Sequence, residues 1–183
     1  IVSLKRKSKG ECLGADCTTG IWLICNMINA KIPGVYVVHA EEEGGCVGSK
    51  ALVESDPQWL DDVNYVISFD RYGKKSVITH QMGRRTASDK FAKLLAKTLE
   101  LPLKPDPHGS YTDSNVYRSK VSECTNVSVG YYSQHSTEEK QDVVYAYKLL
   151  ECLISADWDQ LQYYRDNTVV EMGSMYGDWY DDD

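Results

Sequence analysis

The sequence lacks the features of membrane proteins and of proteins that bind nucleic acids. No apolar run approaches the roughly 18 residues of a membrane span, and no secretory leader is visible. The formal charge is −7, with no basic stripe. We therefore expect no membrane and no nucleic acid among the partners. Low-complexity tracts and internal repeats are missing too, which predicts a globular domain large enough to bury a core.

The cysteines lack the spacing of a zinc knuckle or a CxxC redox motif. There are six of them, at widely separated positions: Cys12, Cys17, Cys25, Cys46, Cys124 and Cys152. A chain of 183 residues folds without disulfide staples, so reduced thiols in a cytoplasmic protein are favoured over a disulfide framework. The chain begins at Ile1 and not at Met, so we expect that it is processed or trimmed upstream.

Expected strands and helices alternate along the chain. Apolar, β-branched runs predict strands over residues 1–7, 34–40, 64–70 and 124–134, with a turn and partner strand over 72–81. Helical spacing predicts helices over residues 18–31, 49–55, 88–100 and from the mid-130s to 154, with a short helical stretch over 57–63. This alternation predicts an α/β fold of three layers, a mixed central sheet flanked by helices. Residues 1–165 are expected to form one catalytic-type domain, and 166–183 an acidic tail.

Cap signals accompany three of these helices. The first is predicted to be capped by Thr18 or Thr19, and the helix over 88–100 by Ser88. Ser136 and Glu139 are predicted to form a capping box at the start of the last helix. The inward face of the first helix is predicted to consist of Ile21, Ile24, Cys25 and Ile28.

Metal-capable side chains follow the predicted strands. Glu42 and Glu43 follow one strand, Asp70 ends another and His135 follows a third, while Asp16 lies at a strand-to-helix junction. Because ligands collect beyond the carboxyl ends of strands, we expect these groups to share one rim of the sheet. Carboxylates crowded there repel one another unless a cation neutralises them, and carboxylate plus imidazole suits divalent metals. Each residue alone is explained more simply as a cap, turn or surface residue, but together they favour a metal site.

Four collinear motifs carry a family resemblance. The segments are "LGADCTTGI", "AEEEGGCVGSKAL", "VISFDRYG" and "TNVSVGYYSQHSTEE", and they extend from about Gly10 to the helix that ends near Ile154. They resemble the bridging-Asp segment, the "AEE-x-G-x-x-GS" turn, the ligand-Asp strand and the closing strand of the co-catalytic zinc exopeptidases. This superfamily includes bacterial aminopeptidases, tripeptidase T and zinc deacylases. The resemblance implies the same three-layer fold and one or two divalent metal ions, most simply Zn²⁺.

The resemblance also implies a role for each residue of the rim. Asp16 would bridge two metals, Glu43 and His135 would bind one of them, and Asp70 would bind the other. Glu42 would be the general base that takes a proton from metal-activated water and returns it to the leaving amine. Glu41 has no assigned role, and we expect it to be a surface carboxylate or a neighbour of the metal ligands.

The sequence departs from the family at one ligand. Relatives carry an H-x-D pair upstream of the bridging Asp, whereas no His precedes Asp16 in this chain. A missing N-terminal part, a single-metal site, or a substitute ligand from His39, His80 or His108 would each account for this. A cis peptide found in relatives would fall on Asp16–Cys17, where this chain has Cys in place of a second Asp.

Two classes of function follow from these expectations. The first is a metal-dependent hydrolase of peptide or related amide bonds, most simply an aminopeptidase on short peptides. A deacylase of acylated small molecules is a closely related alternative within this class. The second is a peptidase-like binding or structural module with an incomplete metal site. A cysteine hydrolase built on Cys17 or Cys46 with His135 is disfavoured, because no motif brings thiolate and imidazole together. In "SYTDSNVY", Asp113 is expected either to orient a ligand imidazole or to stabilise a turn.

Overall fold

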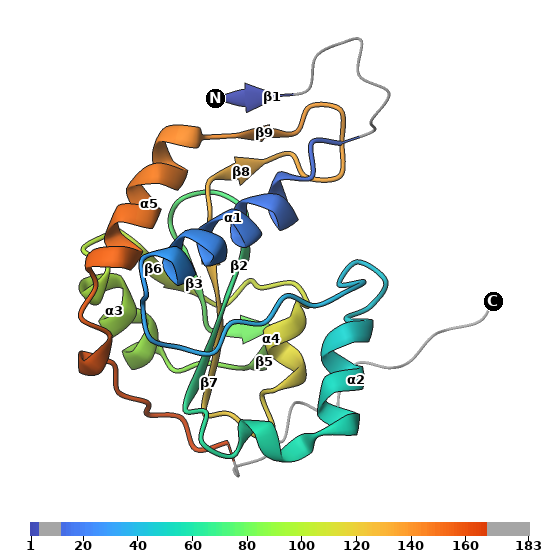
Figure 1. Cartoon of the computed structure of the whole chain (residues 1–183), viewed down its shortest axis with the longest axis vertical. Helices are drawn as coiled ribbons and strands as arrows, with labels where there is room; N and C mark the ends of the chain where they lie inside the picture. Colours follow the sequence, from blue (N-terminus) through green and yellow to red (C-terminus); the bar gives the residue numbers. More distant parts are fainter. Residues whose placement is uncertain (4–11, 168–183) are drawn as a thin grey trace, which may run out of the picture.

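The computed structural model (Figure 1) describes residues 1–3 and 12–167 around a four-stranded sheet. The four strands are β2 (Tyr65–Arg71), β3 (Ser76–Ile78), β6 (Lys104–Asp106) and β7 (Glu123–Ser128). Their order across the sheet is β2-β7-β3-β6. β2 pairs parallel with β7, β7 antiparallel with β3, and β3 parallel with β6. The sheet is therefore mixed, as the sequence predicts.

Two smaller sheets lie beside the central one. Their strands are β1 (Val2–Ser3), β4 (His80–Gln81), β5 (Arg84–Arg85), β8 (Tyr131–Tyr132) and β9 (Lys140–Gln141). β1, β9 and β8 form one antiparallel sheet, and β4 and β5 form a hairpin. The predicted strand over 124–134 is therefore two strands, interrupted where Gly130 adopts a φ of 95°.

Helices flank the central sheet. They are α1 (Ala15–Asn29), α2 (Val47–Ser55), α3 (Asp89–Thr98), α4 (Asp113–Val116) and α5 (Val143–Ser155), with short 3-10 turns η1 (Pro57–Leu60) and η2 (Trp158–Gln160). α1 packs on β2 and α5, α3 on β3 and β6, and α4 on β2 and β7. In the described part of the chain, every helix is too short or too polar to cross a bilayer.

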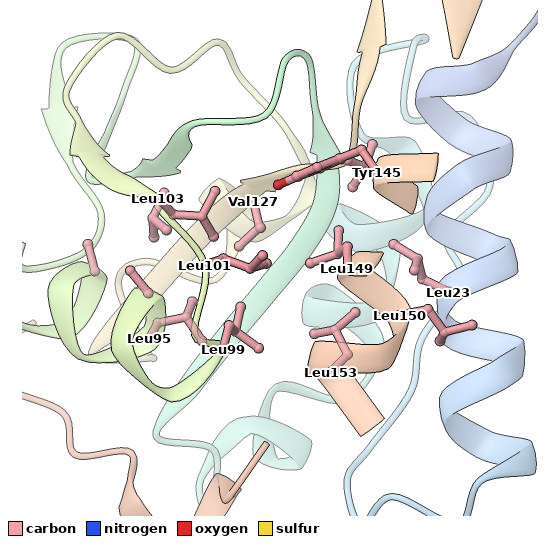
Figure 2. Close-up of a cluster of buried hydrophobic side chains, with 14 of the residues drawn as sticks. Leu23, Leu95, Leu99, Leu101, Leu103, Val127, Tyr145, Leu149, Leu150 and Leu153 are labelled. Carbon is pink, nitrogen blue, oxygen red and sulfur yellow. The ribbon is translucent and has the colours of Figure 1, made fainter. Parts of the chain in front are cut away.

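Side chains of β2 alternate between two apolar clusters. Tyr65, Ile67 and Phe69 pack against the larger cluster, and Val66 packs against the smaller. Figure 2 shows part of the larger cluster, where leucines of α1, α3 and α5 meet between the helices and the sheet. The smaller cluster consists of Leu60, Tyr117, Val121 and Cys124. Because alternate residues of a strand face opposite sides, the clusters lie on opposite faces of the sheet, which makes three layers.

The strand predicted over 34–40 is wrong. These residues follow α1 as a segment without strand pairing, and Val35 and Val38 are 74% and 58% exposed. Their composition suits a strand, but a strand also requires a neighbour to pair with. Among the described residues no such neighbour is present.

The start and the inward face of the first helix also differ from the prediction. α1 begins three residues earlier than Thr18, after Gly14 in a left-handed conformation with a φ of 70°. Its buried side includes Leu23 and Met27, while Ile21 and Ile28 are 39% and 49% exposed. Apolar residues surround much of this helix, so the pattern alone selects the wrong face.

The capping box is wrong and the cap at Ser88 is confirmed. α5 begins after Asp142, whose side chain accepts a hydrogen bond from the Tyr145 backbone, so Ser136 and Glu139 do not cap it. α3 begins after Ser88, whose Oγ accepts from the Phe91 backbone at 3.0 Å. Of the predicted acidic tail, residues 168–183 lie outside the described part of the chain.

Candidate metal centre

Asp16 is held in the first turn of α1 by the carboxylate of Glu139. The Glu139 oxygens accept hydrogen bonds from the backbone N–H groups of Leu13, Gly14 and Ala15 at 2.7, 2.9 and 2.9 Å. Helix N-termini carry unpaired N–H groups and favour negative charge. Glu139, fully buried, therefore replaces the missing side-chain cap of α1 and fixes where Asp16 emerges. The Asp16–Cys17 peptide is trans, so the expected cis bond is wrong: this bond lies inside a regular helical turn.

Gly20 sets how closely α1 approaches the sheet. A Cβ at this position would clash with the carbonyl oxygen of Phe69 in β2. Only a residue without a side chain allows this contact. The close packing brings Asp16, one turn before Gly20, toward Asp70, which is the residue after Phe69.

A tight turn presents Glu42 and Glu43. The backbone N–H groups of Gly45 and Cys46 donate to the Glu42 carbonyl at 2.9 and 2.8 Å, and the turn leads directly into α2. Gly45 has a φ of 96°, in the left-handed region that favours glycine. At Gly48 an added Cβ would lie 2.8 Å from the backbone of Ala40. The glycines thus close the turn that the sequence predicts, although no paired strand precedes it.

Three predicted ligands converge. Nε2 of His135 lies 2.9 Å from Oδ2 of Asp16 and 2.8 Å from Oε1 of Glu43. One ligand atom from each residue falls within 4.8 Å of the others. The Asp16 side chain is buried, while those of Glu43 and His135 are 64% and 58% exposed. Burial lowers the pKa of His135, but the nearby Glu43 and Asp16 outweigh it and raise this pKa above its usual value.

Asp70 and Glu42 lie beside this group but outside the set of three. Asp70 is the next-to-last residue of β2 and is half-buried, and its Oδ2 accepts a hydrogen bond from the Thr112 hydroxyl at 3.2 Å. Burial, with Glu42 and Asp16 nearby, raises the pKa of Asp70 to about 8. Burial and the adjacent Glu43 also raise the pKa of Glu42, whose Oε1 lies 3.9 Å from the Cys46 thiol. The rim thus holds several carboxylates, and the described residues around it supply too little positive charge to neutralise them.

The remaining histidines lie outside the three-residue group. Nε2 of His39 is 2.7 Å from the Tyr117 hydroxyl, and burial lowers the pKa of this imidazole. His108 is exposed and its Nδ1 lies 3.1 Å from Oδ1 of Asp106. His80 lies in β4, where its Nδ1 is 3.1 Å from the Thr79 hydroxyl. Any of these as a substitute ligand stays a prediction.

Sequence reasoning missed two residues that organise the site. Thr112 orients Asp70 from the loop before α4, and Glu139 holds α1 from a segment more than 120 residues away. Neither role has a local signal, since both residues act on a distant part of the chain. Asp113 begins α4, and its Oδ1 is buried without a hydrogen-bond partner among the described residues.

Comparison with solved structures places the fold. PhTET1-12s, a dodecamer in its asymmetric unit, matches with a TM-score of 0.56 and 16% identity over 75% of this chain and 46% of its own. The chain has the fold of the TET aminopeptidases. The expected resemblance to co-catalytic zinc exopeptidases is thereby confirmed at the level of the fold.

Two further solved structures agree. The TET aminopeptidase of the marine sediment archaeon Thaumarchaeota archaeon SCGC AB-539-E09 matches with a TM-score of 0.54 and 16% identity, over 76% of this chain and 44% of its own. Aminopeptidase APDkam598 of the archaeon Desulfurococcus kamchatkensis matches with a TM-score of 0.52 and 18% identity, over 75% of this chain and 45% of its own. The chain thus spans less than half the length of these TET aminopeptidases. No protein-family model and no curated protein matches it.

Proposed function

We propose that the chain carries the metal-binding and catalytic residues of an aminopeptidase-like hydrolase of peptide or related amide bonds. The observation that carries the proposal is the convergence of Asp16, Glu43 and His135 from three distant segments of the chain. Two carboxylates and one imidazole are a donor set that zinc accepts, with an open position for water. The uncompensated carboxylates around them fit a cation, because a positive charge would relieve their repulsion. The TET aminopeptidase fold supports the same class of reaction.

Each residue of the rim has a task in this reaction. Asp16, Glu43 and His135 would hold one zinc ion, and Asp70, next to Asp16, would hold a second. Zinc supplies Lewis acidity and lowers the pKa of water from about 15.7 toward about 7. Glu42 accepts the proton of the attacking water on its carboxylate and then transfers it to the leaving amine. Short peptides, or acylated small molecules, are the proposed substrates.

A peptidase-like binding module is the second candidate. The observation in its favour is that Asp70 lies outside the three-residue ligand group, with a neutral hydroxyl as its side-chain partner. A carboxylate pair without an imidazole binds a metal loosely. Such a chain would hold one metal through His135 and would not hydrolyse peptides.

Glu42 and Glu43 provide the test, because the proposed roles of these neighbours differ. Glu43→Gln should lose the zinc that the parent chain retains through dialysis, since one ligand is removed. Glu42→Gln should retain the zinc but lower hydrolysis of an aminoacyl-p-nitroanilide by about 10²–10⁴-fold. Glu41→Gln, at the exposed neighbouring position, is the matched control and should change neither. Metal content by mass spectrometry and the hydrolysis rate are the two readouts.

Two results would contradict these roles. Equal zinc retention in Glu42→Gln and Glu43→Gln would remove Glu43 from the ligand set. Full hydrolysis by Glu42→Gln would remove Glu42 as the base. If the parent retains zinc without hydrolysing any substrate, the binding module is the better account.

A further inference from the structure

The turn of residues 40–48, which we call the glutamate turn, is shaped by its own backbone. Four of its N–H groups donate to carbonyls of the same turn at 2.8–3.2 Å. These bonds close the turn, but they do not join it to the rest of the fold. Glu43 contacts His135 only at the exposed metal centre. Contacts elsewhere must therefore hold Glu42 and Glu43 in place before a metal binds.

The two ends of the glutamate turn are held differently. At its carboxyl end, Cys46 and Ser49 are buried at the start of α2. At its amino end, Val38 and Ala40 are exposed, and His39 between them is half-buried. The side chain of His39 is thus placed to hold the amino end of the turn.

The hydrogen-bond partner of His39 is a buried tyrosine. Nε2 of His39 lies 2.7 Å from the hydroxyl of Tyr117, and Tyr117 is 2% exposed. Tyr117 directly follows α4, which contacts α2 (Figure 1), and it belongs to the smaller apolar cluster. The ring of Trp59 meets the ring of Tyr117 edge-on, with centroids 5.5 Å apart. Burial raises the pKa of the Tyr117 hydroxyl and lowers the pKa of His39, so the hydroxyl is the donor and a neutral imidazole accepts on Nε2.

We infer that Tyr117 is a positioning residue for the glutamate turn and acts through His39. The hydroxyl of Tyr117 fixes the imidazole, and the imidazole fixes the backbone three residues before Glu42 and four before Glu43. Without the hydroxyl, a half-buried imidazole nitrogen loses its partner and the amino end of the turn is released. Zinc binding would then have to order the turn, which lowers the affinity. The inference rests on the proposed roles of Glu42 and Glu43, but the anchoring of the turn is measurable without zinc or hydrolysis.

Hydrogen exchange of the metal-free chain and zinc calorimetry test the inference on all 183 residues. Tyr117→Phe removes only the hydroxyl and keeps the ring in its cluster. It should speed backbone exchange in residues 40–48 and weaken zinc binding, each by about tenfold. Exchange in α3 and α5 should stay as in the parent. Tyr147→Phe, at an exposed position of α5, is the matched control and should change neither quantity.

Three further variants separate the hydrogen bond from a general loss of structure. His39→Leu should match Tyr117→Phe. The double variant should be no worse than either single one, because all three lack the same bond. His39→Gln should restore most of the parent's behaviour, since its amide oxygen can accept from Tyr117.

The inference is overturned if Tyr117→Phe leaves exchange in the glutamate turn or zinc affinity unchanged, or if exchange rises throughout the chain. Additive effects of the two single changes, or no rescue by His39→Gln, would overturn it as well. A loss of zinc affinity in His39→Leu but not in Tyr117→Phe would make His39 itself a ligand and contradict the inference. A parent chain that binds no zinc would refute the proposed metal centre instead. Exchange in the metal-free chain would then still decide whether Tyr117 holds the turn.

Discussion

Asp70 is a carboxylate whose surroundings disfavour its own charge. It is half-buried, it accepts a hydrogen bond from a neutral hydroxyl, and Glu42 and Asp16 lie nearby, so its pKa rises to about 8. An isolated aspartate has a pKa near 3.9. Ionisation of such a residue destabilises the folded state, unless a bound cation neutralises the charge. The free energy of unfolding of the metal-free chain should therefore depend on the ionisation of Asp70.

The first prediction concerns the pH dependence of the metal-free chain. Because the folded pKa of Asp70 exceeds the unfolded one, the folded state binds more protons between about pH 4 and pH 8. The contribution of Asp70 to the free energy of unfolding is therefore largest at low pH and falls as pH rises through this window. Urea unfolding at pH 5.5 and pH 8 should show this loss, and Asp70→Asn should reduce it. Asp61→Asn, at an exposed position, is the control, and an equal slope in all three proteins would contradict the prediction.

At the scale of elements, α1 depends on a residue far from it in sequence. Glu139 satisfies three backbone N–H groups at the start of α1, where no local side chain caps the helix. Gly20 then lets α1 approach β2 closely, at the carbonyl of Phe69. Together these contacts place Asp16 beside Asp70.

The second prediction is the effect of replacing this cap. Glu139→Gln replaces one charged acceptor oxygen by an amide that cannot accept from the helix, so a buried N–H group loses its partner. We expect a loss of about 1–3 kcal/mol in the free energy of unfolding and weaker zinc binding through Asp16. Glu138→Gln, the exposed neighbour, should change neither quantity. Urea unfolding and zinc calorimetry provide the measurements, and a Glu139→Gln chain as stable as Glu138→Gln would refute the cap.

Elements with local signals were predictable from the sequence. α3 combines the Ser88 cap with an apolar stripe, and β2 is an apolar run that ends at a charged residue, so both occur where the pattern predicts them. The segment 34–40 has an equally good strand pattern, but strand formation depends on a neighbour that the pattern does not contain. Glu139 matches a capping box with Ser136, yet its hydrogen bonds go to α1. The predictions that failed are thus those that depend on contacts between distant parts of the chain.

At the scale of the whole molecule, the candidate site was more predictable than its supports. Asp16 lies in the first turn of α1, Glu43 in the turn before α2 and His135 in the turn after β8, and these segments meet at one rim of the fold. Thr112 and Glu139 were not predictable, because hydrogen bonding over long sequence distances leaves no periodic pattern. The chain spans less than half of the TET aminopeptidases that it resembles, and this bears on what the 183 residues do alone.

The third prediction is that these 183 residues hydrolyse peptides poorly and bind two metals unequally. Asp16 and Asp70 offer carboxylates without an imidazole, so a metal held there exchanges readily. Adding an upstream segment with an H-x-D pair should raise the zinc content from about one to about two ions per chain and increase hydrolysis. Calorimetry and peptide assays of both chains provide the comparison. Two sites of equal affinity, or brisk hydrolysis by the 183 residues alone, would contradict it.

The most direct measurement of the central claim is zinc K-edge X-ray absorption on the zinc-loaded chain. The account predicts a first shell of nitrogen and oxygen at about 2.0–2.2 Å with the outer-shell signal of one imidazole. In His135→Ala that imidazole signal should disappear and zinc affinity should fall at least tenfold, whereas Gln134→Ala, at the exposed neighbouring position, should match the parent. A sulfur neighbour at about 2.3 Å would contradict the account by placing a thiolate such as that of Cys17 on the metal. An unchanged spectrum in His135→Ala would contradict it equally.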